Sequence, residues 1–250
     1  METKNGCSVL GVAFDGRSQE ELEKVIGTYI SGDRFGRITT INPEFLVLAH
    51  RDAAFGDVLR AADVRVADGS GVVLAGLLFG CGLSRYPGAD LMKFILSKAE
   101  REGIDVYVAT KKDGLSIYED VRKALLMEYP DLRLNGEDMD SDSKQVPSGI
   151  RDAMVVLCNF GAPEQEYFLE SLRRDPGSVR LAVGVGGAFD FVTGKRSRAP
   201  RWMRAMGLEW IFRFAIQPSR VGRIWSAVVI FPFLLLSDRI SNAYRTERNR

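Results

Sequence analysis

The sequence predicts an α/β protein built on a doubly wound, mostly parallel sheet. Short apolar runs rich in β-branched residues alternate with longer segments of helical periodicity, which is typical of successive β-α-β units. The first apolar runs are 7–14, 37–41 and 64–68, and the helical segments between them are 18–30 and 43–62. Because helical crossovers cover a parallel sheet, the pattern indicates a Rossmann-like architecture.

Helix-start signals support two of the expected helices. Ser18 and Glu21 have the spacing of a capping box, in which the two residues satisfy each other's backbone N–H groups. Asn42 stands before Pro43, a residue favoured at the first helical position. The same alternation predicts further strands at 105–110, 132–134, 153–161 and 179–187, and further helices at 91–103, 115–129 and 163–175.

Composition and charge fit one globular body and exclude several classes of protein. The chain has 250 residues, of which 46% are hydrophobic and 27% charged, and these values suit a single substantial core. Its formal net charge of +1 gives no general attraction to nucleic acid, so no nucleic-acid partner is expected. The first residues lack the basic and apolar regions of a secretory signal, and we expect a cytoplasmic protein.

Cysteine and histidine usage restricts the chemistry further. Cys7, Cys81 and Cys158 are far apart and form no CxxC pair, which argues against a disulfide framework and a zinc site and favours a reducing compartment. His50 is the single histidine, so a histidine-rich metal site is excluded and a Ser/His/Asp triad is disfavoured. We expect His50 on a helix, in a surface or packing role.

The composition changes after about residue 200. Tryptophans and arginines flank an apolar run at 224–236, which is shorter than the roughly 20 residues that a membrane-spanning helix needs. This mixture suits a helical segment that lies in an anionic lipid interface. The alternative is a C-terminal helix that packs on the body or in an oligomer interface. We divide the chain into a body, residues 1–206, and a membrane-associating appendage, residues 207–250.

Four loops are rich in polar residues and glycine, and each follows a predicted strand. They occupy 39–44, 68–71, 161–166 and 184–190. Doubly wound sheets bind their ligands at the carboxyl ends of the strands, in the loops that open the next helices. We therefore expect the functional residues to cluster in these four loops.

Asp68 is the candidate general base. The neighbouring Gly69 and Gly71 let the backbone approach a ligand closely while the carboxylate projects into the cleft. An alternative role for Asp68 is to cap the helix that follows it. Thr40 and Asn42 carry groups that can hydrogen-bond a substrate hydroxyl or a diphosphate, and Asn42 has the alternative role of a helix cap.

The glycine turn at 184–190 resembles part of a dinucleotide fingerprint. It lacks an acidic residue at the expected distance and leads into a polar segment instead of a helix, so a nicotinamide site is disfavoured. Lys195, Arg196 and Arg198 follow the turn, where their charge suits a diphosphate leaving group. The alternative is a solvated basic loop.

Two Asp-x-Asp sequences raise the question of a divalent metal ion. Asp138, Asp140 and Asp142 provide both of them, inside a polar stretch that we expect to be an exposed loop. Nothing apolar is available there to shield an ion and its ligands. We therefore expect no metal site.

Eight short motifs in one order resemble a known glycosyltransferase family. They are T-x-N-P-E at 40–44, D-G-x-G at 68–71, R-x-x-G-x-D at 85–90, G-x-P-x-Q-E at 161–166, G-G-x-F-D-x-x-x-G at 186–194, R-A-P at 198–200, L-E-W at 208–210 and P-x-R at 218–220. Their order and spacing resemble the WecG/TagA/CpsF family, glycosyltransferase family 26, over nearly the whole chain. One departure is Glu164, where relatives often carry lysine.

The resemblance implies an inverting transferase that needs no metal or other cofactor. Its donor would be a UDP-sugar, and its acceptor a polyprenyl-diphosphate-linked glycan at the inner face of a bacterial membrane, in surface polysaccharide biosynthesis. The resemblance assigns the base to Asp68, an active-site threonine to Thr40 and donor binding to Arg85 and Gln165. Together with the loops, it gives further substrate-binding candidates, Asn42, Gly69, Gly71, Gly161, Glu166, Gly186, Gly187 and Asp190, and leaving-group candidates, Arg198, Arg213, Arg220 and Arg223.

Two other functions stay open on the sequence alone. The glycine turns suggest an NAD-dependent oxidoreductase, although no complete fingerprint is present. The C-terminal segment suggests a non-catalytic membrane scaffold of a polysaccharide assembly complex, although the polar loop residues argue for an enzyme. The sugar and a homo-oligomeric state are not determined by the sequence.

Overall fold

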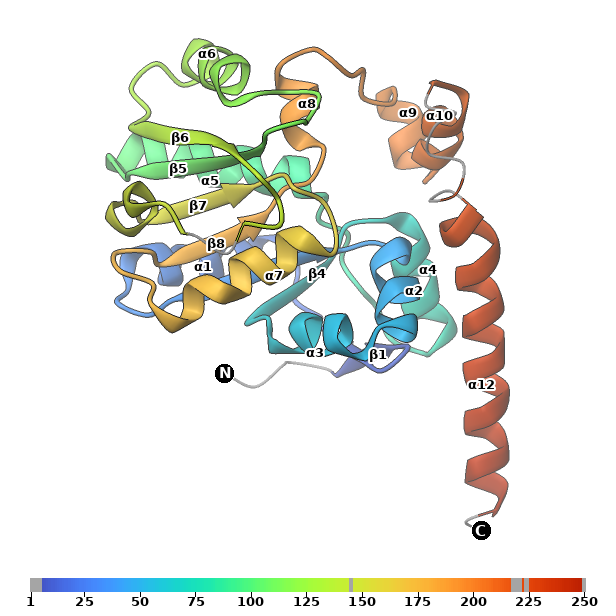
Figure 1. Cartoon of the computed structure of the whole chain (residues 1–250). Coiled ribbons are helices and arrows are strands. Elements are labelled where there is room, and N and C mark those ends of the chain that lie inside the picture. Colours follow the sequence, from blue (N-terminus) through green and yellow to red (C-terminus); the bar gives the residue numbers. More distant parts are fainter. Residues whose placement is uncertain (1–5, 144–145, 217–221, 223–224, 249–250) are drawn as a thin grey trace.

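The computed structural model describes residues 6–143, 146–216, 222 and 225–248 and confirms the predicted α/β class. Its main sheet contains six strands in the order β4-β3-β8-β7-β5-β6, and every neighbouring pair is parallel (Figure 1). The doubly wound, Rossmann-like architecture is thereby confirmed. The strands are β3 (Gly36–Ile41), β4 (Val64–Ala67), β5 (Val106–Lys111), β6 (Leu134–Met139), β7 (Val155–Cys158) and β8 (Leu181–Gly184).

The helices begin where the capping signals predict. The Ser18 side chain accepts from the Glu21 backbone N–H in a complete capping box, and the Asn42 side chain caps the helix that begins at Pro43. The helices are α1 (Gln19–Ser31), α2 (Pro43–Arg51), α3 (Ala53–Ala61), α4 (Ser70–Leu78), α5 (Gly88–Glu102), α6 (Tyr118–Glu128), α7 (Glu164–Ser171), α8 (Ala188–Val192), α9 (Arg201–Ala205), α10 (Glu209–Ile216) and α12 (Phe231–Arg248).

The central strands are buried on both faces. In β8, Leu181 and Val183 belong to an apolar cluster with α1 and α5, whereas Ala182 belongs to a second cluster with α7. Successive strand residues point to opposite faces, so a sheet covered on both sides needs continuous apolar runs. A third cluster joins α2, α3, α4 and the first turns of α12 to the N-terminal residues.

Two segments are divided differently from the prediction. Residues 7–14 form no strand of the main sheet but an antiparallel hairpin, β1 (Cys7–Val9) and β2 (Val12–Phe14), with positive φ at Leu10 and Gly11. The predicted helix 43–62 is two helices, because Asp52 ends α2 and its side chain accepts from the first turn of α3. The turn at Leu10 and Gly11 thus divides the first segment, and the Asp52 cap divides the second.

Two polar segments are more ordered than predicted. β6 extends into the stretch expected to be a loop, because an edge strand pairs its backbone with β5 and needs few buried side chains. The glycine turn after β8 leads into the five-residue helix α8, where no helix was expected. His50 is exposed on α2, in line with the prediction.

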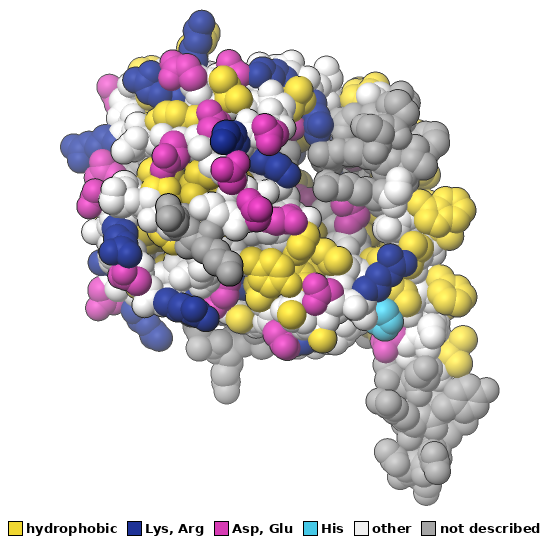
Figure 2. Space-filling model, viewed as in Figure 1, with side chains coloured by type: hydrophobic (Ala, Val, Ile, Leu, Met, Phe, Trp, Pro, Cys, Tyr) yellow, Lys and Arg dark blue, Asp and Glu magenta, His cyan; other side chains and the backbone are white. Residues whose placement is uncertain are grey.

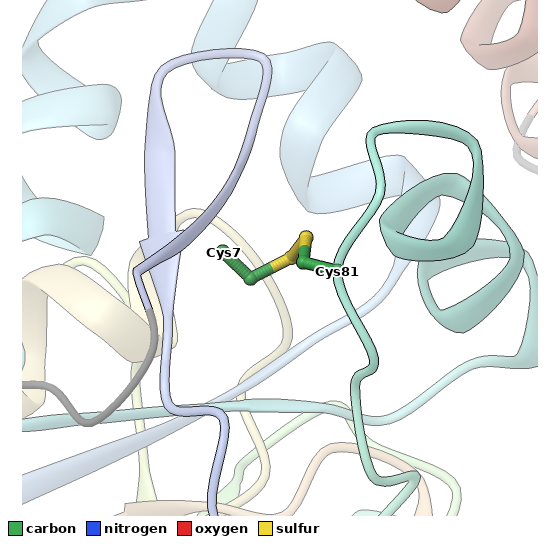
Figure 3. Close-up of a disulfide and its surroundings, with 2 residues drawn as sticks. All are labelled: Cys7 and Cys81. Atoms are coloured by element: carbon green, nitrogen blue, oxygen red, sulfur yellow. A yellow bond between two sulfur atoms is a disulfide. The ribbon is translucent and has the colours of Figure 1, made fainter.

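The expectation against a disulfide is wrong. Cys7 and Cys81 are joined by a disulfide, with their Cα atoms 5.5 Å apart (Figure 3). The two residues are 74 positions apart and meet because the hairpin packs against the loop after α4, which no local spacing can indicate. Cys158 is free, and burial raises the pKa of its thiol. The bond ties the hairpin to the segment that leads into Arg85.

The C-terminal helix α12 extends away from the body (Figure 1). Phe231 and Leu235, in its first turns, are buried against the cluster that contains α2. Phe233 and Leu236 are 70% and 61% exposed. In the described part of the chain, no helix has both the length and the apolar character needed to cross a membrane.

A buried arginine joins β3 to α7. The Nη1 of Arg37 donates to Oε2 of Glu166 at 2.6 Å, and its Nε donates to Oε2 of Glu170 at 2.8 Å. The hydroxyl of Thr39 donates to the same oxygen of Glu166 at 2.8 Å. Arg37 and Glu166 are both fully buried, where an unpaired charge is very unfavourable. This network therefore fixes α7 against the sheet.

We predict that Arg37→Met lowers the free energy of unfolding by about 3–5 kcal/mol, because the Glu166 carboxylate is left buried without its cation. Chemical denaturation measures the change. The matched control is Arg60→Met, which removes an exposed ion pair with Asp57 and should alter stability by no more than about 1 kcal/mol. Equal effects of the two substitutions would contradict the structural role of Arg37.

Candidate active site

The four polar loops follow four strands that are neighbours in the sheet. The loops after β4, β3, β8 and β7 stand in this order, because the strands do. Ile41 pairs with Ala67 at the ends of β3 and β4, and Cys158 pairs with Gly184 at the ends of β7 and β8. The loops therefore leave the same edge of the sheet side by side, where a doubly wound fold binds its ligand.

Asp68 faces the start of a helix that is distant in sequence. Its Oδ1 accepts a hydrogen bond from the backbone N–H of Gly88, the first residue of α5, at 2.7 Å. The alternative role as cap of the following helix is wrong, because α4 has Gly69 as its N-cap and no side-chain cap hydrogen bond. The positive end of the α5 dipole thus meets the Asp68 carboxylate.

Arg85 lies beside the same loop. Its Nε donates to the backbone oxygen of Asp68 at 3.0 Å, and its Nη1 donates to the backbone oxygen of Arg204 at 3.0 Å. Its Nη2 pairs with Oε2 of Glu209 at 3.0 Å. The predicted donor-binding arginine therefore bridges the Asp68 loop and the chain after residue 200.

Asp90 and Arg198 form a two-pronged ion pair. Two nitrogens of Arg198 donate to the two carboxylate oxygens of Asp90, at 2.6 and 2.9 Å. Burial acts to raise the pKa of Asp90, but the hydrogen bond and charge of Arg198, with Arg204 and Arg85, hold it below its ordinary value. The hydrogen bonds that Arg198 donates to Asp90 raise the pKa of Arg198. An anion that reaches Arg198 must share it with Asp90.

Gln165 links the loops after β7 and β8. Its Oε1 accepts from the backbone N–H of Gly186 at 3.2 Å, and its Nε2 donates to Glu166 at 3.1 Å. A Cβ atom on Gly184 would lie 1.9 Å from Nε2 of Gln165, so any other residue there would displace the Gln165 amide. The hydroxyl of Thr40 donates to the Gly184 backbone oxygen at 3.2 Å. Thr40 and Gln165 thus meet at the end of β8.

Two predicted substrate-binding carboxylates form ion pairs or hydrogen bonds with other residues of the protein. Glu166 is fully buried in its ion pair with Arg37. Asp190 accepts from the Ser116 hydroxyl at 2.9 Å and pairs with Arg196 at 3.2 Å. These contacts suit residues that hold the loops in place beneath a ligand. Gly161 has a positive φ of 83° in the loop before α7, and Gly187 is the N-cap of α8.

The residues after β3 and β4 pack together closely. The Asn42 side chain caps α2, so its alternative role as a cap is confirmed. Cβ atoms on Gly69 and Gly71 would lie 3.3 and 3.0 Å from the ring of Pro43. Both glycines therefore let the Asp68 loop lie against the start of α2.

Of the remaining basic candidates, the structure describes the side chain of Lys195 but not those of Arg213, Arg220 and Arg223. Lys195 pairs with Asp120 and also donates to a backbone oxygen, so its charge is directed toward α6. Arg213 falls within α10, with its side chain outside the description. Arg220 and Arg223, also predicted to stabilise a leaving group, lie outside the described residues.

Two of the Asp-x-Asp residues, Asp138 and Asp140, make contacts with other residues of the protein. Asp138 accepts from the Thr110 hydroxyl and from the Tyr118 backbone N–H, both at 2.8 Å. Asp140 lies 3.7 Å from Lys112. Within the described ranges, no three side chains of His, Cys, Asp or Glu are grouped so that they could hold a metal ion.

Some residues of the site were not predicted from the sequence. Glu209 belongs to the L-E-W motif, which was noted without a role, and this motif was the available signal. Ser116 stands in a polar turn before α6 and had no signal, because its partner Asp190 is 74 positions away. Arg204 contributes its backbone oxygen, which no residue pattern indicates.

Comparison with known proteins shows that this chain is a glycosyltransferase. Its parallel sheet, loop carboxylate and surrounding arginines are thus those of a sugar-transferring enzyme. The chain is a member of the Glycosyl transferase WecG/TagA/CpsF family, which matches residues 7–245. The resemblance carried by the eight motifs is thereby confirmed.

Two relatives share one description, "N-acetylglucosaminyldiphosphoundecaprenol N-acetyl-beta-D-mannosaminyltransferase". The relative from Bacillus subtilis (strain 168) is 32% identical over 198 residues, which cover 76% of this chain and 75% of the relative. The relative from Bacillus spizizenii (strain ATCC 23059 / NRRL B-14472 / W23) is 31% identical over 222 residues, which cover 86% and 84% of the two chains. Similarity thus extends over most of the length on both sides.

Proposed function

We propose that this protein is an inverting glycosyltransferase that moves a sugar from a UDP-sugar to a polyprenyl-diphosphate-linked glycan in surface polysaccharide biosynthesis. The observation that carries the proposal is the pairing of Asp68 with the N-terminus of α5, directly beside Arg85. A carboxylate and a cation then stand at the ligand-binding edge of the sheet. The description of both relatives supports N-acetylmannosamine as the first sugar to test.

In the proposed reaction Asp68 is the general base. The acceptor hydroxyl attacks the anomeric carbon from the face opposite the departing UDP, and its proton passes to a carboxylate oxygen of Asp68. The new bond joins the acceptor oxygen to the anomeric carbon, and the bond from that carbon to the diphosphate oxygen breaks. A single displacement of this kind inverts the configuration at the anomeric carbon.

The departing UDP develops negative charge, which the site must compensate. Arg85 and Arg198 supply cations beside the Asp68 loop, and N–H groups at the start of α4 and α5 add oriented dipoles. Arg213, Arg220 and Arg223 are further candidates from the appendage. This set of groups supports a reaction that needs no metal or other cofactor.

The C-terminal residues are the proposed membrane contact of the enzyme. We divide the chain into a catalytic domain, residues 1–206, and an appendage, residues 207–250, at the inner face of the cell membrane. Hydrophobic side chains gather along the outer edge of the first half of α12 (Figure 2). Exposed aromatic and aliphatic residues on α9, α10, the π-helical turn Ser226–Ile230 with its N-cap, and α12 support this contact: Trp202, Trp210, Ile211, Ile216, Trp225, Val229, Phe233, Leu236 and Ile240.

We predict that Asp68→Asn lowers turnover at least about 100-fold, because the amide keeps the shape but cannot take the proton. Transfer from UDP-N-acetylmannosamine to a lipid-diphosphate-linked N-acetylglucosamine is measured, with UDP binding and circular dichroism as checks on the fold. Asp57→Asn, which changes an exposed aspartate on α3, is the control and should keep full activity. Turnover of Asp68→Asn close to the unsubstituted rate would exclude Asp68 as the base.

We predict that transfer continues in excess EDTA, because arginines and backbone N–H groups supply the compensating charge. The same assay is run with and without the chelator. Activity that is lost in EDTA and restored by magnesium or manganese would contradict this prediction. In that case Asp138→Asn would show whether the Asp-x-Asp residues bind the ion.

We predict that full-length protein binds vesicles containing phosphatidylglycerol, and that Phe233→Ser with Leu236→Ser weakens binding at least about tenfold, since each inserted apolar side chain contributes roughly 1.5 kcal/mol or more. Vesicle flotation measures binding, which high salt should also weaken. Leu115→Ser with Met127→Ser is the control, because both residues are exposed and lie in or just before α6, away from α12 (Figure 1). Equal binding by both double variants would argue against α12 as the contact.

A further inference from the structure

The chain after residue 200 is bonded to the active-site loops at three points. The Ser70 hydroxyl donates to the Gly207 backbone oxygen at 3.1 Å. Arg85 donates to the Arg204 backbone oxygen and pairs with the Glu209 carboxylate, each at 3.0 Å. These contacts join the Asp68 loop and Arg85 to the segment that leads into the appendage.

A glycine turn brings Glu209 to this position. Gly207 has a φ of +73°, and a Cβ atom there would lie 3.0 Å from the Ser70 side chain. The turn therefore needs glycine for its conformation and for the close approach to α4. Glu209 follows as the first residue of α10 and reaches Arg85 from there.

The orientation of Arg85 depends on this segment. A guanidinium has five N–H donors in one plane, and three atoms of Arg85 have the partners described above. Two of the three partners, Arg204 and Glu209, come from the chain after residue 200. The side chains of Arg85 and Glu209 are only 24% and 15% exposed, so solvent screens their ion pair less than a surface pair.

We propose that Glu209 is a positioning residue, which orients Arg85 toward the diphosphate of the donor. The inference rests on the proposed function, in which Arg85 binds the donor. The guanidinium plane of Arg85 is held at three atoms, so less rotational freedom is lost when a diphosphate binds.

An alternative role of Glu209 predicts the opposite effect on donor binding when its carboxylate is removed. If its carboxylate competed with the diphosphate for Arg85, removing its charge would strengthen donor binding. If it orients Arg85, removing the carboxylate oxygens weakens donor binding, and an amide that leaves an acceptor oxygen in place restores much of it. Glu209→Ala and Glu209→Gln therefore separate the two roles.

The experiment measures kcat and KM for the UDP-sugar with the full-length chain. Glu209→Ala should lower kcat/KM for the donor roughly tenfold, mainly through KM, and Glu209→Gln should stay within about threefold of the unsubstituted enzyme. Arg85→Ala combined with Glu209→Ala should be no worse than Arg85→Ala alone, because the second residue acts through the first. Glu128→Ala, which breaks an exposed ion pair with Lys93, is the matched control and should change neither constant.

Three results would overturn the inference. These are a lower donor KM in both Glu209 variants, additive losses in the double variant, or full activity of Glu209→Ala when Arg85→Ala is inactive. Calorimetric UDP binding gives a readout apart from turnover and should weaken in Glu209→Ala. If Glu209→Ala does not fold, Glu209→Asp replaces it, since the shorter side chain should also raise the donor KM.

Failure of the proposed function gives a different pattern. If the unsubstituted protein does not bind UDP, or if Arg85→Ala keeps full turnover, the role of Arg85 itself is wrong. Weak turnover of Arg85→Ala together with normal turnover of Glu209→Ala would be consistent with the proposed transferase function. It would exclude only the positioning role of Glu209.

Discussion

The buried ion pair between Arg37 and Glu166 is the interaction on which the site depends. It places α7 against β3 beneath the loops, and the neighbouring residue Gln165 then reaches the turn after β8. Because Gln165 donates to Glu166 and accepts from Gly186, a continuous chain of hydrogen bonds runs from the core to the edge of the sheet. A charge that is fully buried tolerates few alternative arrangements, so this pair favours a single position of the loops.

Two arginines of the site are paired with carboxylates of the protein. Arg85 pairs with Glu209, and Arg198 pairs with Asp90. Each pair joins segments that are distant in sequence, so the charges hold the site together as well as supplying cations. In the proposed function a diphosphate would share these arginines with the carboxylates, which favours a ligand with several negative oxygens over one with a single charge.

The sequence predicted those structural features whose physical cause lies within a few neighbouring residues. Apolar periodicity predicted the parallel sheet, and Ser18 and Asn42 marked helix starts through hydrogen bonds within one turn. The order of the four loops along the sheet edge and the partner of Asp68, twenty positions away, depend on topology and could not be predicted. The division at Asp52 was missed because one side chain ends one helix and caps the next. Family motifs pointed to Glu209 without explaining it, since its partner is an arginine 124 positions away.

The disulfide between Cys7 and Cys81 has a consequence for the unfolded chain. The loop that it closes spans 74 positions and contains β3, β4, Thr40 and Asp68. In the chain-entropy description, closing a loop of this length removes conformations from the denatured state and stabilises the native state by about 4 kcal/mol. The strands β3 and β4, the proposed base and the proposed active-site threonine thus belong to a covalent ring, so a single backbone cut between Cys7 and Cys81 would leave both pieces attached to one molecule.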